Sequence, residues 1–283
     1  MATRPLAGDE LLAAGNSEAL SEPAHLFLKN QLLAEAARAG TGSGEPPQGR
    51  FYGVFSPHGL ELVAFFGASR LLCHGPGPLS VVDELADLAL AGERGARIVI
   101  GPRQLGLALL ARLRPFVDID VDRSQPFMCV SDERRLGPSL AVRLANRKDA
   151  GWLLQASLQL NEEDLGIRAA TVDRRVLRQR VLERIQDGLT WLTEATPGHP
   201  ASKLEVGIEG PAGALIEGVF TDPQYRGQGF ARGLVAAVSR DLLQRCPHVG
   251  LHVGRSNEAA IAAYDAAGFE EVEDLELALL TWR

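Results

Sequence analysis

Lysine, cysteine and aromatic residues are all scarce in this sequence of 283 residues. Only three of its 29 basic residues are lysines, and aromatic residues make up 6% of the chain. The 36 acidic residues outnumber the basic ones, so the net charge is -7. A surface that follows nucleic-acid phosphates needs an excess of basic side chains, because its affinity depends on the release of condensed counterions. The composition therefore predicts that nucleic acid is not a partner.

The three cysteines, Cys73, Cys129 and Cys246, lie far apart and form no C-x-x-C pair. This spacing supports neither a disulfide framework nor a thiolate metal cage, and it is typical of a reducing compartment. Two histidines, His248 and His252, flank one apolar strand run, where an extended chain holds them too far apart to chelate one metal ion. We therefore expect a cytoplasmic protein without a metal site.

Long apolar runs are also missing. No stretch approaches the roughly 20 apolar residues that a membrane-spanning helix needs. Acidic residues near the start of the chain, among them Asp9 and Glu18, interrupt the apolar run that a secretory signal requires. We therefore expect no membrane partner. The apolar content of 46% is enough for the core of one large or two ordinary globular domains.

Turn-forming and charged residues cluster over residues 131–138 and separate two halves of similar length. We predict domains over residues 1–137 and 138–283. In the first half a loose N-terminal stretch precedes elements with clear apolar spacing. These are helices over residues 25–39 and 81–91, a β-hairpin over 51–67, a strand over 97–101 and a helix that begins after Pro102.

The second half is predicted to contain a mixed series of strands and helices. Strands are expected over residues 140–145, 189–194, 204–209, 214–220 and 249–254 and within 275–282, and helices over 149–160, 173–187, 230–245 and 257–268. Both halves place a hairpin, a strand, a turn and a helix in the same order. This order is consistent with an internal duplication.

A glycine-containing loop links the predicted strand over 214–220 to the predicted helix over 230–245. Gly227 and Gly229 allow the loop backbone to approach a ligand closely. The start of the helix adds unpaired N–H groups and the positive end of the helix dipole, so the natural ligand is an anion. On the glycines alone, a simple turn into the helix explains the pattern equally well.

Two short motifs follow one another in this half of the chain. Arg226, Gly229 and Ala231 fit the pattern Q/R-x-x-G-x-G/A, after a turn over residues 222–226. Further along, the pattern N-x-x-A-x-x-x-Y-x-x-x-G-F is matched by Asn257, Ala260, Tyr264, Gly268 and Phe269. With these motifs the chain resembles the GNAT superfamily of acetyl-CoA-dependent N-acetyltransferases. The resemblance extends over residues 138–283 and is clearest from Ala214 onward.

The resemblance implies an α/β (α+β) fold of tandem GNAT-like domains, each a mixed, mostly antiparallel sheet flanked by helices. The first half resembles the degenerate N-terminal GNAT-like domain that precedes the catalytic domain in some bacterial proteins, because its loop over residues 102–106 lacks the second glycine. Acetyl-CoA is the implied co-substrate. The residues implied to contact it are Val219, Phe220, Thr221, Arg226, Gly227, Gln228, Gly229, Phe230, Ala231 and Asn257. Asn257 equally suits the cap of the following helix.

The resemblance also assigns Tyr264 as the acid that protonates the departing thiolate. A free tyrosine has a pKa of about 10, so it keeps its proton at neutral pH. Glu217 is the charged residue of an otherwise apolar strand, and alternation places it on the same face as Val219 and Thr221. We therefore predict that Glu217 is the base. The structural alternatives are that Tyr264 packs beside Ile261 and that Glu217 lies at a sheet edge.

An acidic run over residues 161–164 follows the first predicted helix of the second half. We expect it to form a loop, in the region where the resemblance places the acceptor. Glu162 and Glu163 are predicted to attract a cationic amine and to help deprotonate it. The overall acidity of the chain also favours a cationic acceptor. A solvated acidic turn without a substrate is the plain alternative.

Together these residues predict an N-acetyltransferase that transfers an acetyl group from acetyl-CoA to a primary amine by direct attack in a ternary complex. We expect a monomer or homodimer. One alternative is a non-catalytic acyl-CoA sensor or interaction module. The other is an NADP-dependent oxidoreductase, in which Gly227, Gly229 and Gly233 bind the dinucleotide and Arg255 binds a 2'-phosphate. The length of the loop between the strand and the glycines argues against the oxidoreductase.

Overall fold

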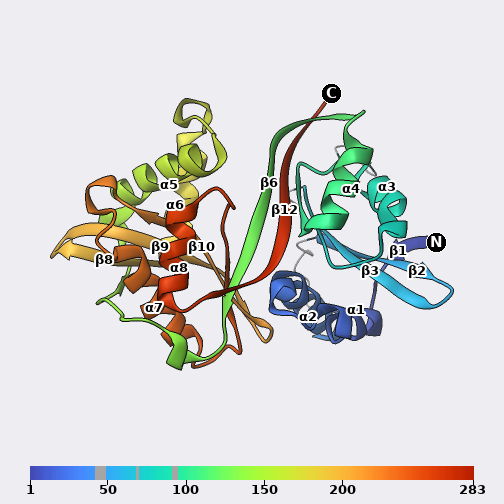
Figure 1. Cartoon of the computed structure of the whole chain (residues 1–283), viewed down its shortest axis with the longest axis horizontal. Coiled ribbons are helices and arrows are strands. Elements are labelled where there is room, and N and C mark those ends of the chain that lie inside the picture. Colours follow the sequence, from blue (N-terminus) through green and yellow to red (C-terminus); the bar gives the residue numbers. More distant parts are fainter. Residues whose placement is uncertain (42–48, 68–69, 91–94) are drawn as a thin grey trace. The chain divides into compact units, whose positions relative to one another are not determined.

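The computed structural model describes residues 1–41, 49–67, 70–90 and 95–283 (Figure 1). They form two compact units, one made of Met1–Phe127 with Val272–Arg283 and the other of Met128–Glu271. The predicted boundary after residue 137 therefore differs from the observed one, which lies earlier in the chain. The predicted second domain also included the last strand, β12 (Glu270–Trp282), most of which belongs to the first unit.

β12 belongs to the first unit because it pairs there with β5 (Ile98–Pro102), to which it runs antiparallel. The strands of this unit follow the order β1-β2-β3-β4-β5-β12-β6, and β4 and β5 are parallel. The remaining strands are β1 (Ala2–Pro5), β2 (Gly49–Ser56), β3 (Gly59–Gly67), β4 (Leu71–His74) and β6 (Val117–Val130), whose last residues belong to the second unit. Sequence reasoning missed β6, although residues 117–122 alternate between apolar residues and aspartate, which is the period of a strand.

Helices pack on both faces of this sheet because side chains alternate along its strands. On β3, Leu62 and Ala64 join one core with the helices α3 (Val82–Leu90) and α4 (Arg103–Leu113). Val63 and Phe65 join a second core with α1 (Asp9–Gly15) and α2 (Leu26–Thr41).

Most predicted elements of the first unit are confirmed. The β-hairpin corresponds to β2 and β3, and the three helices correspond to α2, α3 and α4. Ala91, the predicted last residue of one helix, lies outside the described residues. The N-terminal stretch was predicted to be loose, and this is wrong. It forms β1, which pairs with β2, and α1, which packs on α2, because Leu6, Leu11 and Ala14 are buried in the second core.

The second unit contains the residues of both sequence motifs. Its strands follow the order β6-β11-β10-β9-β8-β7, in which β10 and β11 are parallel and the pairs from β7 to β10 are antiparallel. The strands are β7 (Arg143–Leu144), β8 (Thr190–Thr196), β9 (His199–Gly210), β10 (Gly213–Thr221) and β11 (Val249–His252). The helices are α5 (Ala150–Leu165), α6 (Arg174–Gln186), α7 (Phe230–Leu242) and α8 (Glu258–Ala267). This is the predicted mixed, mostly antiparallel sheet with flanking helices.

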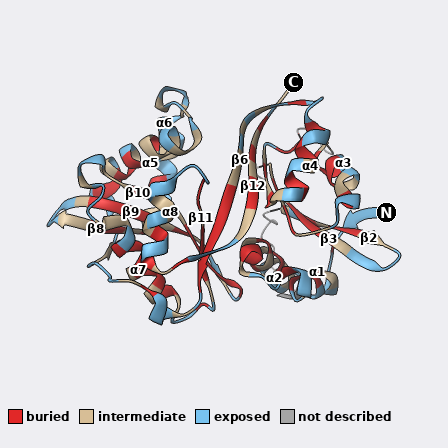
Figure 2. Cartoon of the chain, viewed as in Figure 1, coloured by how far each residue is buried: buried red, intermediate tan, exposed pale blue. Residues whose placement is uncertain are grey.

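The main core of the second unit joins α7 and α8 to the central strands. Leu234 and Val238 of α7 are fully buried in one cluster with Ile216 of β10 and Leu251 of β11. Burial of each such side chain contributes roughly 1.5–3 kcal/mol. Figure 2 shows buried residues along the strands and exposed residues on the helices. The core therefore fixes the position of the loop that precedes α7 and of the side chains on α8.

The predicted bounds of two elements of this unit are wrong. The strand predicted over residues 140–145 shortens to β7. The helix predicted over residues 149–160 continues to Leu165, so the acidic run over 161–164 lies in the last turn of α5 rather than in a loop. α5 ends at Gly166, whose φ of 67° is a left-handed conformation that glycine adopts without steric strain.

Two glycines that end helices in the left-handed conformation differ in their surroundings. A Cβ at Gly166 would meet nothing within 4 Å, whereas a Cβ at Gly268 would overlap the carbonyl oxygen of Arg135. We expect Gly166→Ala to lower the free energy of unfolding by about 1 kcal/mol, which is the cost of the left-handed conformation for alanine. Gly268→Ala should cost about 3 kcal/mol, because the clash adds to that strain. Urea denaturation of both variants measures the difference, and equal losses would contradict the packing described for Gly268.

Candidate functional site

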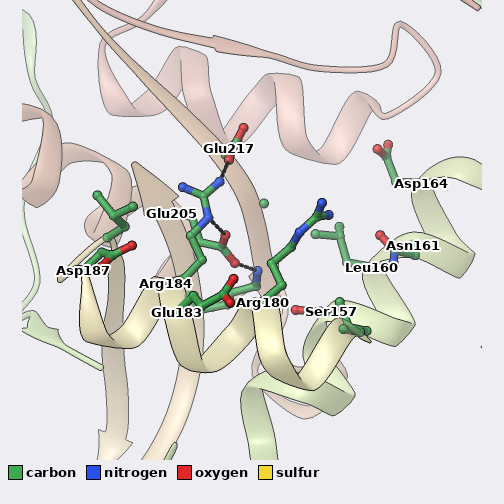
Figure 3. A pocket seen from close by; sticks show the side chains of 14 residues that line it. Ser157, Leu160, Asn161, Asp164, Arg180, Glu183, Arg184, Asp187, Glu205 and Glu217 are labelled. Atoms are coloured by element: carbon green, nitrogen blue, oxygen red, sulfur yellow. Dashed lines mark hydrogen bonds and ion pairs between the residues drawn. The ribbon is translucent and has the colours of Figure 1, made fainter. Parts of the chain in front are cut away.

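Two cavities in the second unit share the strand β10. The first has a volume of about 650 Å³ and is lined mainly by residues of 219–232 and 257–266; we call it the loop cavity. The second has a volume of about 680 Å³, is lined by residues of α5, α6, β9 and β10, and is called the α6 cavity (Figure 3). All residues predicted to contact acetyl-CoA line the loop cavity, together with Tyr264.

β10 contributes to both cavities because its regular pairing stops part of the way along. It pairs with β11 only over residues 214–216, and its register against β9 shifts after Glu217. Gly218 follows with a φ of 60°, a left-handed conformation at a β-bulge. Glu217 and Gly218 line the α6 cavity, whereas Val219 and Thr221 line the loop cavity. The prediction that Glu217 shares a face with Val219 and Thr221 is therefore wrong, because the bulge interrupts the alternation.

The loop before α7 has the features of an anion-binding turn. Gly227 and Gly229 adopt φ values of 74° and 83°. Gly229 is the N-cap of α7 and provides no capping side chain, so the N–H groups of Phe230 and Ala231 begin the helix without an acceptor inside it. The positive end of the α7 dipole lies at the same place. These features favour an anion such as a pyrophosphate.

Arg226 connects this loop to two other elements. Its guanidinium donates a hydrogen bond to the carbonyl oxygen of Thr221 at 3.1 Å and forms an ion pair of 2.8 Å with Glu163 of α5. Because both charged side chains are largely exposed, the pair contributes at most about 1 kcal/mol. The predicted acceptor residue Glu163 is therefore a partner of Arg226 at the edge of the loop cavity. The other one, Glu162, is exposed and lines neither cavity.

Tyr264 projects from α8 and has 6% of its surface exposed. Burial raises the pKa of its hydroxyl, and the negative charge of Asp164 raises it further. The phenol therefore keeps its proton at neutral pH, as a proton donor must. Asn257 caps α8 by accepting a hydrogen bond of 3.1 Å from the amide of Ala260, and it also lines the loop cavity. Capping and a ligand contact are thus compatible roles for Asn257.

Glu217 is held by a chain of charged groups at the wall of the α6 cavity (Figure 3). It pairs with the guanidinium of Arg184, which also lies 3.3 Å from a carboxylate oxygen of Glu205. Glu205 accepts a hydrogen bond of 2.7 Å from Lys203, whose side chain is only 2% exposed. Burial raises the pKa of Glu217, and the charge of Arg184 opposes that shift. The sequence did not predict Arg184, Glu205 and Lys203 as site residues, because only the packing of α6 on β9 and β10 brings them to Glu217.

The corresponding loop of the first unit has different chemistry. Pro102 precedes α4, and no residue from Pro102 to Gly106 has a positive φ. The buried side chain of Glu276 lies against the first turn of α4, with one oxygen 3.5 Å from the guanidinium of Arg103. Burial raises the pKa of Glu276 to about 7. A carboxyl group beside the helix start disfavours a phosphate there, which supports the prediction of a degenerate first half.

Further features concern a metal site, membrane-spanning helices and the oxidoreductase alternative. Within the described ranges, no group of three or more His, Cys, Asp or Glu side chains is arranged to hold a metal ion. None of the described helices has the length and apolar character that crossing a membrane requires. Arg255, which the oxidoreductase alternative needs for a 2'-phosphate, instead makes two hydrogen bonds of 2.6 and 2.7 Å to Glu271.

Comparisons with known proteins show similarity to acetyltransferases. Residues 159–269 match the model of the Acetyltransferase (GNAT) family. An acetyltransferase of Sodalis glossinidius is 30% identical over 81 residues, which cover 28% of this chain and 56% of that protein. The match therefore spans about half the length of that relative.

Solved structures that resemble the whole chain include the following two. One is a GCN5-related N-acetyltransferase from Sphaerobacter thermophilus, with a TM-score of 0.58, 15% identity and coverage of 99% of this chain and 95% of that one. The other is a tandem GNAT protein from the clavulanic acid biosynthesis pathway, with a TM-score of 0.52, 14% identity and coverage of 99% and 98%. At this level of identity the likeness concerns the fold alone.

The left-handed conformation of Gly229 makes the loop sensitive to a single methyl group. We expect Gly229→Ala to weaken the binding of acetyl-CoA, the implied ligand, by roughly tenfold, because alanine at this φ costs about 1–2 kcal/mol and the loop relaxes away from the shape that presents its amides. Isothermal titration calorimetry gives the Kd. Gly151→Ala is the matched control, since a Cβ there meets nothing within 4 Å and lies inside α5. Unchanged binding by Gly229→Ala would rule out the loop as the anion site.

Proposed function

We propose that the second unit, whose residues 159–269 match the model of the Acetyltransferase (GNAT) family, transfers the acetyl group of acetyl-CoA to a primary amine. The observation that carries the proposal is the pair of cavities that share the bulged strand β10. The loop cavity has the features that suit acetyl-CoA, and the α6 cavity offers room for a second substrate at the same strand. Both substrates then bind together, and the amine attacks the thioester directly in a ternary complex.

In this proposal acetyl-CoA occupies the loop cavity. Its pyrophosphate accepts hydrogen bonds from amides near Gly227, Gly229 and Ala231, at the positive end of α7. Its pantetheine arm follows residues 219–221, where β10 no longer pairs with β11. An N–H group of this segment polarises the thioester carbonyl, and such a donor stabilises the negative charge that develops on the oxygen.

The reaction needs one group that takes a proton and one that gives a proton. A C–N bond forms as the amine nitrogen attacks the thioester carbonyl, and Glu217 takes a proton from that nitrogen. Its raised pKa makes Glu217 a stronger base than an ordinary carboxylate. The C–S bond breaks, and Tyr264 gives its hydroxyl proton to the departing sulfur. Arg184 keeps the carboxylate of Glu217 at the wall of the α6 cavity.

The proposal predicts that the protein releases free thiol from acetyl-CoA when it is given a suitable primary amine. Spermidine, phenethylamine, glycinamide and a lysine-containing peptide sample different charges and shapes. Thiol release above the rate without amine, together with detection of the acetylated amine by mass spectrometry, would support the proposal. Tight binding of acetyl-CoA without turnover of any of these amines would favour the non-catalytic sensor instead.

Removal of the Tyr264 hydroxyl tests the proposed acid. We expect Tyr264→Phe to lower kcat by about 100-fold, because general acid catalysis typically contributes that much, while the Kd for acetyl-CoA stays unchanged. Tyr225→Phe is the matched control: this tyrosine also lines the loop cavity, where its ring packs on Phe230 at 5.7 Å between centroids. Equal kcat values for Tyr264→Phe and the unmodified protein would exclude Tyr264 as the acid of a rate-limiting step.

A further inference from the structure

Two residues of α5, Leu160 and Asp164, line both the loop cavity and the α6 cavity, and Asp164 is the ionisable one. They lie one helical turn apart. β10 borders the same two cavities with consecutive residues, Gly218 on the α6 cavity and Val219 on the loop cavity. An amine in one cavity and a thioester in the other therefore meet between these two elements. Figure 3 shows Asp164 on the other side of the α6 cavity from Glu217.

We propose that Asp164 binds the ammonium group of the acceptor and takes its first proton, an inference that rests on the proposed function. A primary amine is protonated at neutral pH and has no electron pair with which to attack. The Asp164 carboxylate attracts this cation to the junction of the cavities. One N–H bond of the ammonium breaks as an O–H bond forms on Asp164, and the nitrogen keeps the electron pair that attacks the thioester.

The two carboxylates then have separate tasks. Asp164 takes a proton before the attack, and Glu217 takes a second proton from the same nitrogen once the C–N bond has formed. Tyr264 supplies one proton to the sulfur. After the three groups exchange protons with solvent, one proton is released for each acetyl group transferred. This balance is the one required for converting an ammonium ion and a thioester into an amide and a thiol.

Other members of the acidic run are less suited to this task. Glu163 lines only the loop cavity, and Glu162 lines neither cavity. The remaining charged groups that line the two cavities come from α6 and the residue after it, from β9 and β10, and from the loop before α7 and the start of that helix. They are Arg180, Glu183, Arg184, Asp187, Lys203, Glu205, Glu217, Arg226 and Arg232. Asp164 is the one ionisable residue of the run that borders both cavities.

The substitution Asp164→Asn removes the charge and keeps the shape of the side chain. The acceptor is whichever of spermidine, phenethylamine, glycinamide and the lysine peptide the unmodified protein acetylates fastest. We expect kcat/KM for that amine to fall by about 100-fold at pH 7, with an unchanged Kd for acetyl-CoA. The loss should shrink as the pH approaches the pKa of the amine, because a neutral amine no longer needs a proton acceptor.

Asp265→Asn is the control, since it makes the same chemical change at an exposed residue beside Tyr264 that lines neither cavity. Three results would overturn the inference: normal kcat/KM in Asp164→Asn, a loss that is equal at every pH, or a loss of acetyl-CoA binding. If the unmodified protein is active and Asp164→Asn has a normal kcat/KM, the inference fails but the proposed function stands. An unmodified protein that acetylates none of the amines would overturn the proposed function and this inference together.

Discussion

The register shift of β10 after Glu217 is the constraint on which both cavities depend. In a regular strand, side chains alternate between two faces and pairing with a neighbour continues along the strand. In β10 the pairing with β11 ends at residue 216, and Gly218 turns the backbone through a positive φ. A Cβ at this glycine would come within 3.0 Å of the amino group of Lys203. Gly218 thus lets β10 line two cavities, and it leaves room for the buried amino group of Lys203.

That buried charge explains the chain of side chains behind the bulge. Lys203, Glu205, Arg184 and Glu217 alternate in sign, and each contacts the next. A buried ion pair adds little net stability, because the loss of hydration offsets the attraction between the charges. Removal of Glu205, however, leaves the buried ammonium of Lys203 without this ion pair and is costly. The chain is therefore better explained by the position it gives to Glu217 than by a contribution to folding.

The loop cavity could be anticipated from sequence because its residues are local. A strand end, a loop and a helix start follow one another within residues 219–231, and they line one cavity. The likeness of the whole chain to a tandem GNAT protein confirms the predicted fold. The lining of the α6 cavity could not be predicted in this way. Arg184 and Lys203 belong to no motif and meet only through tertiary packing, and the role proposed for Asp164 depends on α5 continuing to Leu165. Likewise, the spacing of apolar residues does not reveal that β12 pairs with β5, because the two strands lie far apart in the sequence.

In the proposed reaction, acetyl-CoA and the amine occupy their cavities at the same time, and no acetylated enzyme forms between them. Initial velocities of thiol release, with the amine varied at several fixed concentrations of acetyl-CoA, test it directly. Double-reciprocal lines that intersect are predicted, because both substrates bind before any product leaves. Parallel lines, together with an acetylated protein that mass spectrometry detects in the absence of amine, would contradict the account.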